Sequence, residues 1–115
     1  MTTDTTVINP WNVETSPLRK RHLGKTLEEL GELTAVVARC MIQGIDEVDP
    51  SSGKLNRLRL EEEIADVYAQ LDMLEDLFDL DRIFISDRIV VKQGHMDKWS
   101  RLLILQGEGN ETNPV

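Results

Sequence analysis

The chain has 115 residues, of which 40% are hydrophobic and 30% charged, and this composition is typical of one soluble globular domain. Asp and Glu number 21 against 13 Lys and Arg, and the net charge of −8 argues against a nucleic acid or an anionic membrane as partner, because both are polyanions. The single cysteine, Cys40, excludes an intrachain disulfide, and the start MTTDTTVINP lacks the basic and apolar regions of a signal peptide, so we expect a cytoplasmic protein.

The first predicted helix follows a Thr-rich stretch, residues 1–15, which we interpret as an extended N-terminal arm. Ser16 is a favourable N-cap, and Pro17 suits the first helical position, where its missing N–H costs nothing. Apolar residues then recur at spacings of three and four, which predicts a helix over about 17–43. These residues are Leu23, Leu27, Leu30, Val37 and Met41.

Two further helices are predicted, over about 55–79 and about 81–105, from apolar residues at helical spacing. The stretch RIFISDRIVV (82–91) is β-branched enough for a strand, but its length and flanks favour a helix. The polar tail, residues 106–115, is predicted to be disordered. The sequence therefore predicts an all-α domain over residues 16–105, a helical bundle of three main helices.

Four carboxylates are predicted to lie in the space between the first two helices. Glu29 and Glu32 share one edge of the first helix, about 120° from the centre of its apolar stripe, whereas Glu63 and Asp66 fall inside the apolar arc of the second. Carboxylates that converge there repel one another and lose hydration unless a cation joins them. Mg²⁺ prefers such oxygen ligands. The alternative is that all four are solvated at the edges of the stripes.

The acidic segments EELGE (28–32) and EEIAD (62–66) resemble the signature of the MazG-like, all-α nucleoside triphosphate pyrophosphohydrolases. That signature is Glu-Glu-x-x-Glu on one helix and Glu-x-x-Asp on the next. The resemblance runs from about Trp11 to about Leu103 and is closest to the short, single-domain members often carried by bacteriophages, which would place the protein in the host cytoplasm. One departure is the stretch of 30 residues between Glu32 and Glu63, which is long for the family.

The resemblance implies Mg²⁺-dependent hydrolysis of a (d)NTP to the (d)NMP and pyrophosphate, with Mn²⁺ able to replace Mg²⁺. Carried over onto this chain, Glu29, Glu32, Glu63 and Asp66 are the expected metal ligands and catalytic residues, and Glu29 or Glu32 would accept the proton of the attacking water. Glu28 matches the motif but faces outward on the helical wheel, so we do not expect it to bind the metal.

Basic and aromatic residues supply candidate substrate contacts. Lys25 precedes Glu29 by four residues and is expected to meet phosphate oxygens, the alternative being an ion pair within the helix. On the third helix Arg88, Lys92 and Trp99 share a stripe with His95 inside an apolar arc; the two cations suit either the outer phosphates or neutralisation of acidic neighbours. Trp11 is a candidate base-stacking residue, and the alternative is an anchor for the arm.

Three helices of this size bury too little for a comfortable core, and Gly24 and Gly31 on one side of the first helix destabilise it unless another helix packs closely there. We therefore expect oligomerisation to complete the bundle, as a homodimer or homotetramer. Three other functions stay open: a nucleotide-binding sponge or sensor without turnover, a phosphoribosyl-ATP-type pyrophosphohydrolase, and a purely structural helical protein.

Overall fold

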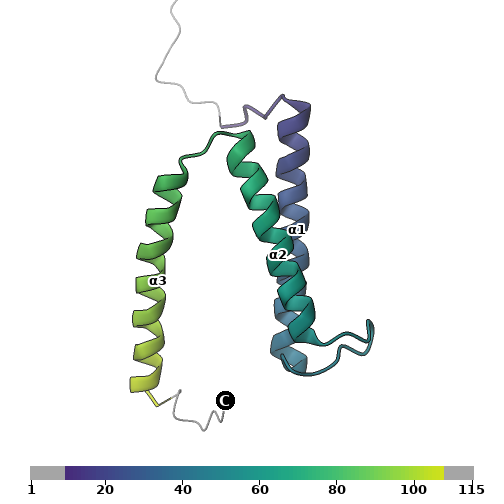
Figure 1. Cartoon of the computed structure of the whole chain (residues 1–115), viewed down its shortest axis with the longest axis vertical. Coiled ribbons are helices and arrows are strands. Elements are labelled where there is room, and N and C mark those ends of the chain that lie inside the picture. The colour runs from purple at the N-terminus through teal and green to yellow at the C-terminus, as the bar shows by residue number, and fades with distance from the viewer. Residues whose placement is uncertain (1–9, 108–115) are drawn as a thin grey trace, which may run out of the picture. The chain divides into compact units, whose positions relative to one another are not determined.

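The computed structural model describes residues 10–107 and contains three helices: α1 (Pro17–Gln43), α2 (Asn56–Leu77) and α3 (Arg82–Leu105) (Figure 1). No strand occurs within residues 10–107, so the prediction of an all-α fold with three main helices is confirmed. The segment 82–91, for which a strand was the alternative, is helical, and α3 continues without interruption through Gly94. The predicted helix limits differ from the observed ones by at most two residues.

The chain divides into two compact units, one that ends at Asp79 and contains α1 and α2, and one that begins at Leu80 and contains α3. Each unit is described by itself below. Residues 1–9 of the predicted arm and 108–115 of the predicted tail lie outside the described residues.

Side-chain caps begin α1 and α3. The Ser16 hydroxyl accepts a hydrogen bond from the Arg19 N–H at 3.3 Å, as its predicted role as an N-cap requires, and Asp81 accepts one from the Phe84 N–H at 2.9 Å. The first of these helices ends at Gly44, whose φ of 103° is readily adopted only by glycine, and the Gly44 N–H donates to the Cys40 carbonyl. These features explain why both helices start, and why α1 stops, where the sequence predicts.

Helices α1 and α2 lie side by side as an antiparallel pair (Figure 1). Most of the buried side chains of this unit are polar or charged. Val36 and Val67 are the buried hydrophobic side chains of the described residues, at 2% and 6% exposure. Five polar or charged residues are buried as well, and they are Thr26, Glu29, Asp49, Asn56 and Gln70. The edge of α1 that carries Glu29 and Val36 therefore faces α2, and the predicted convergence of acidic residues arises from this choice of face.

The apolar stripe of α1 is left exposed by this packing. Leu27 is 72% exposed and Met41 is 80% exposed, and the other three members of the stripe are each at least 39% exposed. An added side chain at Gly24 or Gly31 would meet no other atom of the described residues within 4 Å. The most hydrophobic face of α1 is thus a surface of the α1–α2 unit rather than its core.

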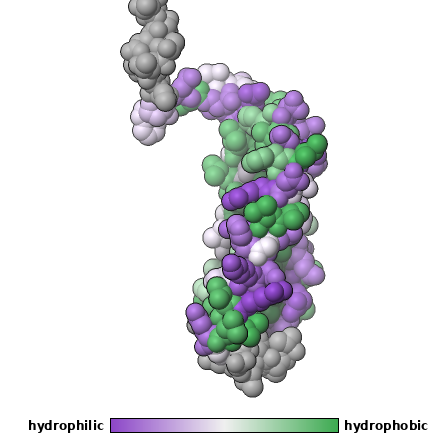
Figure 2. All heavy atoms as spheres, turned by 90° about the vertical axis from the view of Figure 1, so that its left-hand side faces the viewer, coloured by the Kyte–Doolittle hydropathy of each residue, from purple (hydrophilic) through white to green (hydrophobic). Residues whose placement is uncertain are grey.

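Helix α3 also carries hydrophobic side chains on its surface. None of its residues is buried within the described part of the chain, and Figure 2 shows hydrophobic and hydrophilic side chains interleaved along it. Over residues 10–107, no helix combines the length and the hydrophobicity that crossing a membrane requires.

Candidate metal centre

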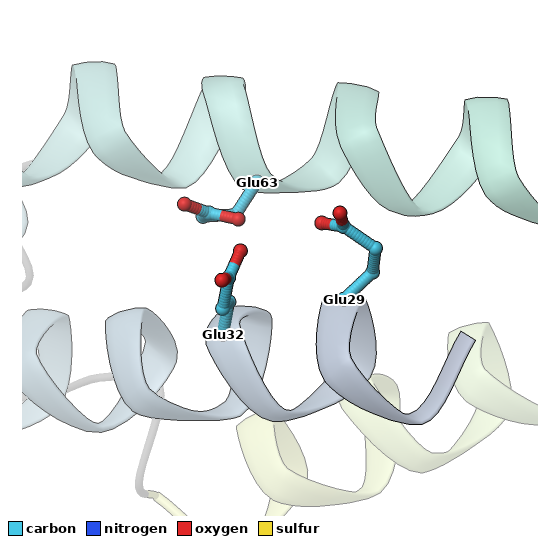
Figure 3. A group of neighbouring side chains, drawn as sticks. All are labelled: Glu29, Glu32 and Glu63. Atoms are coloured by element: carbon cyan, nitrogen blue, oxygen red, sulfur yellow. The ribbon is translucent and has the colours of Figure 1, made fainter. Parts of the chain in front are cut away.

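Three carboxylates from the two packed helices point toward one another (Figure 3). Glu29 and Glu32 project from successive turns of α1 toward α2, and Glu63 projects from α2 with its carboxylate beside that of Glu32. Each offers one carboxylate oxygen, and these three oxygens lie within 4.8 Å of one another. The convergence of Glu29, Glu32 and Glu63 that the sequence predicts is therefore present in the structure.

Two of the three carboxylates each bury an oxygen that has no hydrogen-bond partner among the described residues, namely Glu29 Oε2 and Glu63 Oε2. The Glu29 residue as a whole is only 9% exposed. A buried carboxylate oxygen without a partner is costly, because it has lost water and gained nothing in return. A positively charged ligand would give both oxygens the partner that they lack.

The electrostatics of Glu63 point the same way. Burial is the largest of the effects that raise the pKa of Glu63 above its ordinary value, and the negative charges of Glu32, Asp66 and Glu29 raise it further. The positive charge of Arg59 opposes them. A cation among these side chains would favour the ionised form of Glu63 and offset the repulsion.

Asp66, the fourth predicted ligand, lies outside the group of three converging oxygens. It is exposed, and it follows Glu63 by three residues on the same face of α2, close enough for its charge to influence the Glu63 pKa. Its role as a metal ligand stays a prediction.

Lys25 lies beside the group at its α1 edge. Its ammonium is 3.2 Å from Glu29 Oε1 and 3.3 Å from Glu28 Oε1, and hydrogen bonds to these two carboxylates raise the pKa of Lys25. The ion pair that was the alternative for Lys25 is thus present, and the predicted phosphate contact stays a prediction. The Glu28 side chain is 56% exposed, in agreement with its expected outward position.

The remaining predicted substrate residues lie elsewhere in the chain. Arg88, Lys92 and Trp99 are exposed on α3, which belongs to the other compact unit, and their part in the site stays a prediction. Trp11 is 84% exposed near the start of the described residues, and its base-stacking role is likewise untested by the structure.

Gln70 forms a polar layer next to the carboxylates that sequence reasoning missed. Its amide nitrogen donates to the His22 carbonyl and to the Thr26 hydroxyl, both at 3.2 Å, and lies 3.3 Å from His22 Nδ1. The Thr26 hydroxyl in turn donates to the His22 carbonyl at 2.7 Å. The available signal was a glutamine one turn beyond Asp66, on the same face of the predicted second helix as Glu63 and Asp66.

Asp49, in the loop between α1 and α2, is a second feature that the sequence analysis missed. It is completely buried, and its carboxylate accepts from the Ser51 hydroxyl at 2.9 Å and lies 3.2 Å from a guanidinium nitrogen of both Arg39 and Arg59. The available signal was the segment Asp-Pro-Ser-Ser, since an aspartate before such residues often accepts hydrogen bonds from the backbone that follows.

Comparisons of the chain with protein families, with curated protein sequences and with solved structures found no match.

Proposed function

We propose that this protein is a Mg²⁺-dependent nucleotide pyrophosphohydrolase that cleaves a (d)NTP to the (d)NMP and pyrophosphate. The observation that supports it best is the group Glu29, Glu32 and Glu63, in which two buried carboxylate oxygens have no partner among the described residues. The resemblance of EELGE and EEIAD to the MazG-like signature supplies the reaction class.

The three carboxylates fit a hard divalent cation. Mg²⁺ is bound through one or two protein carboxylates plus water and substrate phosphates, at about 2.0–2.1 Å. Glu29 and Glu63 would hold it through the buried oxygens, and Asp66 would join them from the next turn of α2. Bound Mg²⁺ would neutralise the triphosphate and lower the pKa of the attacking water.

The chain's own residues would then divide the remaining tasks. Glu32 is the exposed member of the group, so it is the carboxylate that solvent reaches most easily and the one to accept the proton of the attacking water. The water would attack the α-phosphorus while the bond from that phosphorus to the bridging oxygen breaks, so that pyrophosphate leaves. Lys25 would meet phosphate oxygens once a cation takes over its pairing with Glu29.

The same proposal includes a homo-oligomer, a dimer or a tetramer. The exposed face of α1 combines Leu27 and Met41 with Gly24 and Gly31, and open space surrounds both glycines among the described residues. Such a face allows a second helix to approach closely and to cover large apolar side chains. A second copy of the chain would supply that helix by an isologous contact.

Pyrophosphate release, screened across canonical and modified nucleotides with Mg²⁺, tests the activity. We expect release with at least one triphosphate and none in EDTA. Mg²⁺-dependent nucleotide binding without release would instead indicate the sponge or sensor, and absence of both would indicate a structural protein.

A further inference from the structure

Two arginines converge on the buried carboxylate of Asp49. Arg39 Nη1 lies 3.2 Å from Oδ1, and Arg59 Nη1 lies 3.2 Å from Oδ2. The carboxylate is held from its other sides by the Ser51 hydroxyl at 2.9 Å and the Gln43 amide at 3.4 Å. Both guanidinium groups are thereby fixed to the loop that joins α1 and α2.

This cluster has a surplus of positive charge. Burial opposes the ionisation of Asp49, but hydrogen bonds from Ser51, Ser52 and Gln43 outweigh it and hold the pKa of Asp49 well below its usual range. One carboxylate thus faces two guanidinium groups. The Arg39 and Arg59 side chains are 41% and 26% exposed, so solvent reaches both, and each guanidinium has more N–H donors than one carboxylate uses.

Arg59 also lies next to the carboxylate group. It precedes Glu63 by four residues on α2, so the two side chains are neighbours on one helix face, and its charge acts on Glu63. Lys25 lies 3.2 Å from Glu29 at the end of the group toward the start of α1. Because α1 and α2 are antiparallel, Arg59 occupies the opposite end, toward the loop. The carboxylates are therefore flanked by a cation on each side.

We propose that Arg59, with Arg39 beside it, forms an anion subsite that binds the pyrophosphate portion of the ligand, and that Asp49 is the positioning residue that holds the Arg59 guanidinium there. The proposal deepens the function proposed above and rests on it. A guanidinium fixed by a buried carboxylate is preorganised for phosphate oxygens, since it loses little side-chain entropy when the ligand binds.

The same helix offers a matched control. Arg57 pairs with Asp46 at 2.7 Å, but both side chains of that pair are more than half exposed, at 54% and 72%. Arg57→Gln and Arg59→Gln remove the same charge two positions apart, so long-range electrostatics change almost equally. Only Arg59→Gln removes a guanidinium that is held beside Glu63.

Calorimetric titration with inorganic pyrophosphate, in millimolar Mg²⁺, tests the subsite. We expect Arg59→Gln to weaken binding about tenfold or more, the effect of one lost charge-assisted hydrogen bond, and Arg57→Gln to change it less than twofold. Equal affinities for the two variants, or a wild type that binds no pyrophosphate, would overturn the proposal. If Arg59→Gln does not fold, Arg59→Lys is used in its place, because lysine keeps the positive charge but lacks the paired N–H donors of the guanidinium group.

Asp49→Asn gives a readout that a purely electrostatic or loop-stabilising role would not produce. Removing a negative charge strengthens anion binding by simple electrostatics, and Asp46→Asn should show this small gain. Asp49→Asn should instead weaken pyrophosphate binding severalfold at temperatures where circular dichroism shows a folded protein, because the guanidinium groups lose their anchor. Tighter binding by both variants would remove Asp49 as a positioning residue.

Failure of the subsite is distinguishable from failure of the proposed function. Mg²⁺ titrations in phosphate-free buffer should show that Arg59→Gln keeps metal binding and that Glu63→Gln loses it. If the wild type binds no Mg²⁺, the proposed function fails, and the same comparison of Arg59→Gln with Arg57→Gln in EDTA still decides whether Arg59 binds pyrophosphate.

Discussion

Glu29 on α1 and Glu63 on α2 both project into the space between the two helices, and each buries one carboxylate oxygen that has no hydrogen-bond partner among the described residues. Oxygens of both side chains lie within 4.8 Å of each other and of an oxygen of Glu32. Two like charges at this separation, partly removed from water, lower the stability of the helix pair. A divalent cation bound between them would reverse that effect.

Mg²⁺ is therefore expected to stabilise the folded protein. A ligand that binds only the native state adds about 2.7 kcal/mol to the free energy of unfolding at 100 times its dissociation constant. Thermal melts in EDTA and in millimolar Mg²⁺ measure this, and the midpoint should rise by several degrees with Mg²⁺. Identical midpoints would contradict a metal site between Glu29 and Glu63.

Glu63→Gln should abolish pyrophosphate release and leave a folded protein, because it removes a ligand charge and relieves repulsion with Glu29 and Glu32. In EDTA the variant should melt above the wild type. Glu61→Gln, an exposed position on the same helix, is the matched control and should change neither property. If both variants behaved alike in the release assay, the assignment of Glu63 to the site would be wrong.

Acidification should stabilise the metal-free protein. The pKa of Glu63 is raised above its ordinary value of 4.5, so the native state takes up a proton before the unfolded chain does, and the free energy of unfolding rises as the pH falls through the raised pKa toward 4.5. Urea unfolding in EDTA between pH 7.5 and pH 5 should show this rise in the wild type, and the rise should be smaller in Glu63→Gln.

Asp49 affects the free energy of unfolding in the opposite direction, and its effect falls below the range from pH 7.5 to pH 5. Its pKa is lowered from an ordinary value of 3.8, so its stabilising contribution is present above that value and is lost only as the pH falls below it. With Mg²⁺ present, the trend for Glu63 should reverse, since protons compete with the metal. A wild-type free energy of unfolding that fell steadily from pH 7.5 to pH 5 in EDTA would contradict the first expectation.

Leu27→Glu should separate the proposed oligomer into single chains. Leu27 is 72% exposed on the glycine-containing face of α1, and a charge there cannot be covered by an apolar helix surface. Light scattering coupled to size-exclusion chromatography measures the mass of both forms. Arg21→Glu, at an exposed position on the same helix about 160° from the centre of the apolar stripe, serves as the charge-change control. A wild type that elutes as a single chain would remove the oligomer from the proposal.

Lys92→Met tests the stripe on α3. If Lys92 meets the outer phosphates, the substitution keeps the packing stem and removes the charge, so binding of a non-hydrolysable triphosphate should weaken by about 1.5–3 kcal/mol while monophosphate binding changes little. If Lys92 only neutralises acidic neighbours, the melting temperature should fall and the ratio of the two affinities should stay the same. Calorimetric titrations with both nucleotides distinguish these outcomes.

Helix periodicity predicted the extents of α1, α2 and α3, because capping residues and apolar spacing are local properties. It also predicted that Glu29, Glu32 and Glu63 converge, since the positions of residues around a helix follow from its geometry. It did not predict that the apolar stripe of α1 would stay exposed when α1 packs against α2. The polar edge with Glu29 and Val36 faces α2 in place of the leucine stripe, and periodicity alone does not rank two such faces of one helix.

The Asp49 cluster was beyond sequence reasoning for a different reason. Its bonds to Arg39 and Arg59 join residues ten positions away on either side, and they require one particular path of the loop between α1 and α2. A loop conformation is set by many weak hydrogen bonds acting together, and the composition of the segment specifies a turn without specifying its partners. The acidic pattern in the sequence predicts the group of carboxylates, but it does not predict that Lys25 and Arg59 lie at the two ends of that group.

The α1–α2 pair is fastened on both sides of its carboxylates. At the end of the pair away from the loop, Gln70 donates hydrogen bonds to Thr26 and His22, and the Arg19 guanidinium lies 4.8 Å from the centre of the Phe78 ring. At the end next to the loop, Asp49 forms ion pairs with Arg39 and Arg59. Between these two sets of contacts, the carboxylates of Glu29 and Glu32 on α1 repel that of Glu63 on α2. Amide protons of α1 near Glu29 and Glu32 should therefore exchange with deuterium faster than is usual for the middle of a long helix. Mg²⁺ should slow this exchange and leave exchange near Arg19 and Gln43 unchanged. Ligand binding would then bring α1 and α2 closer together around the carboxylates, while the contacts at both ends of the helix pair stay as they are.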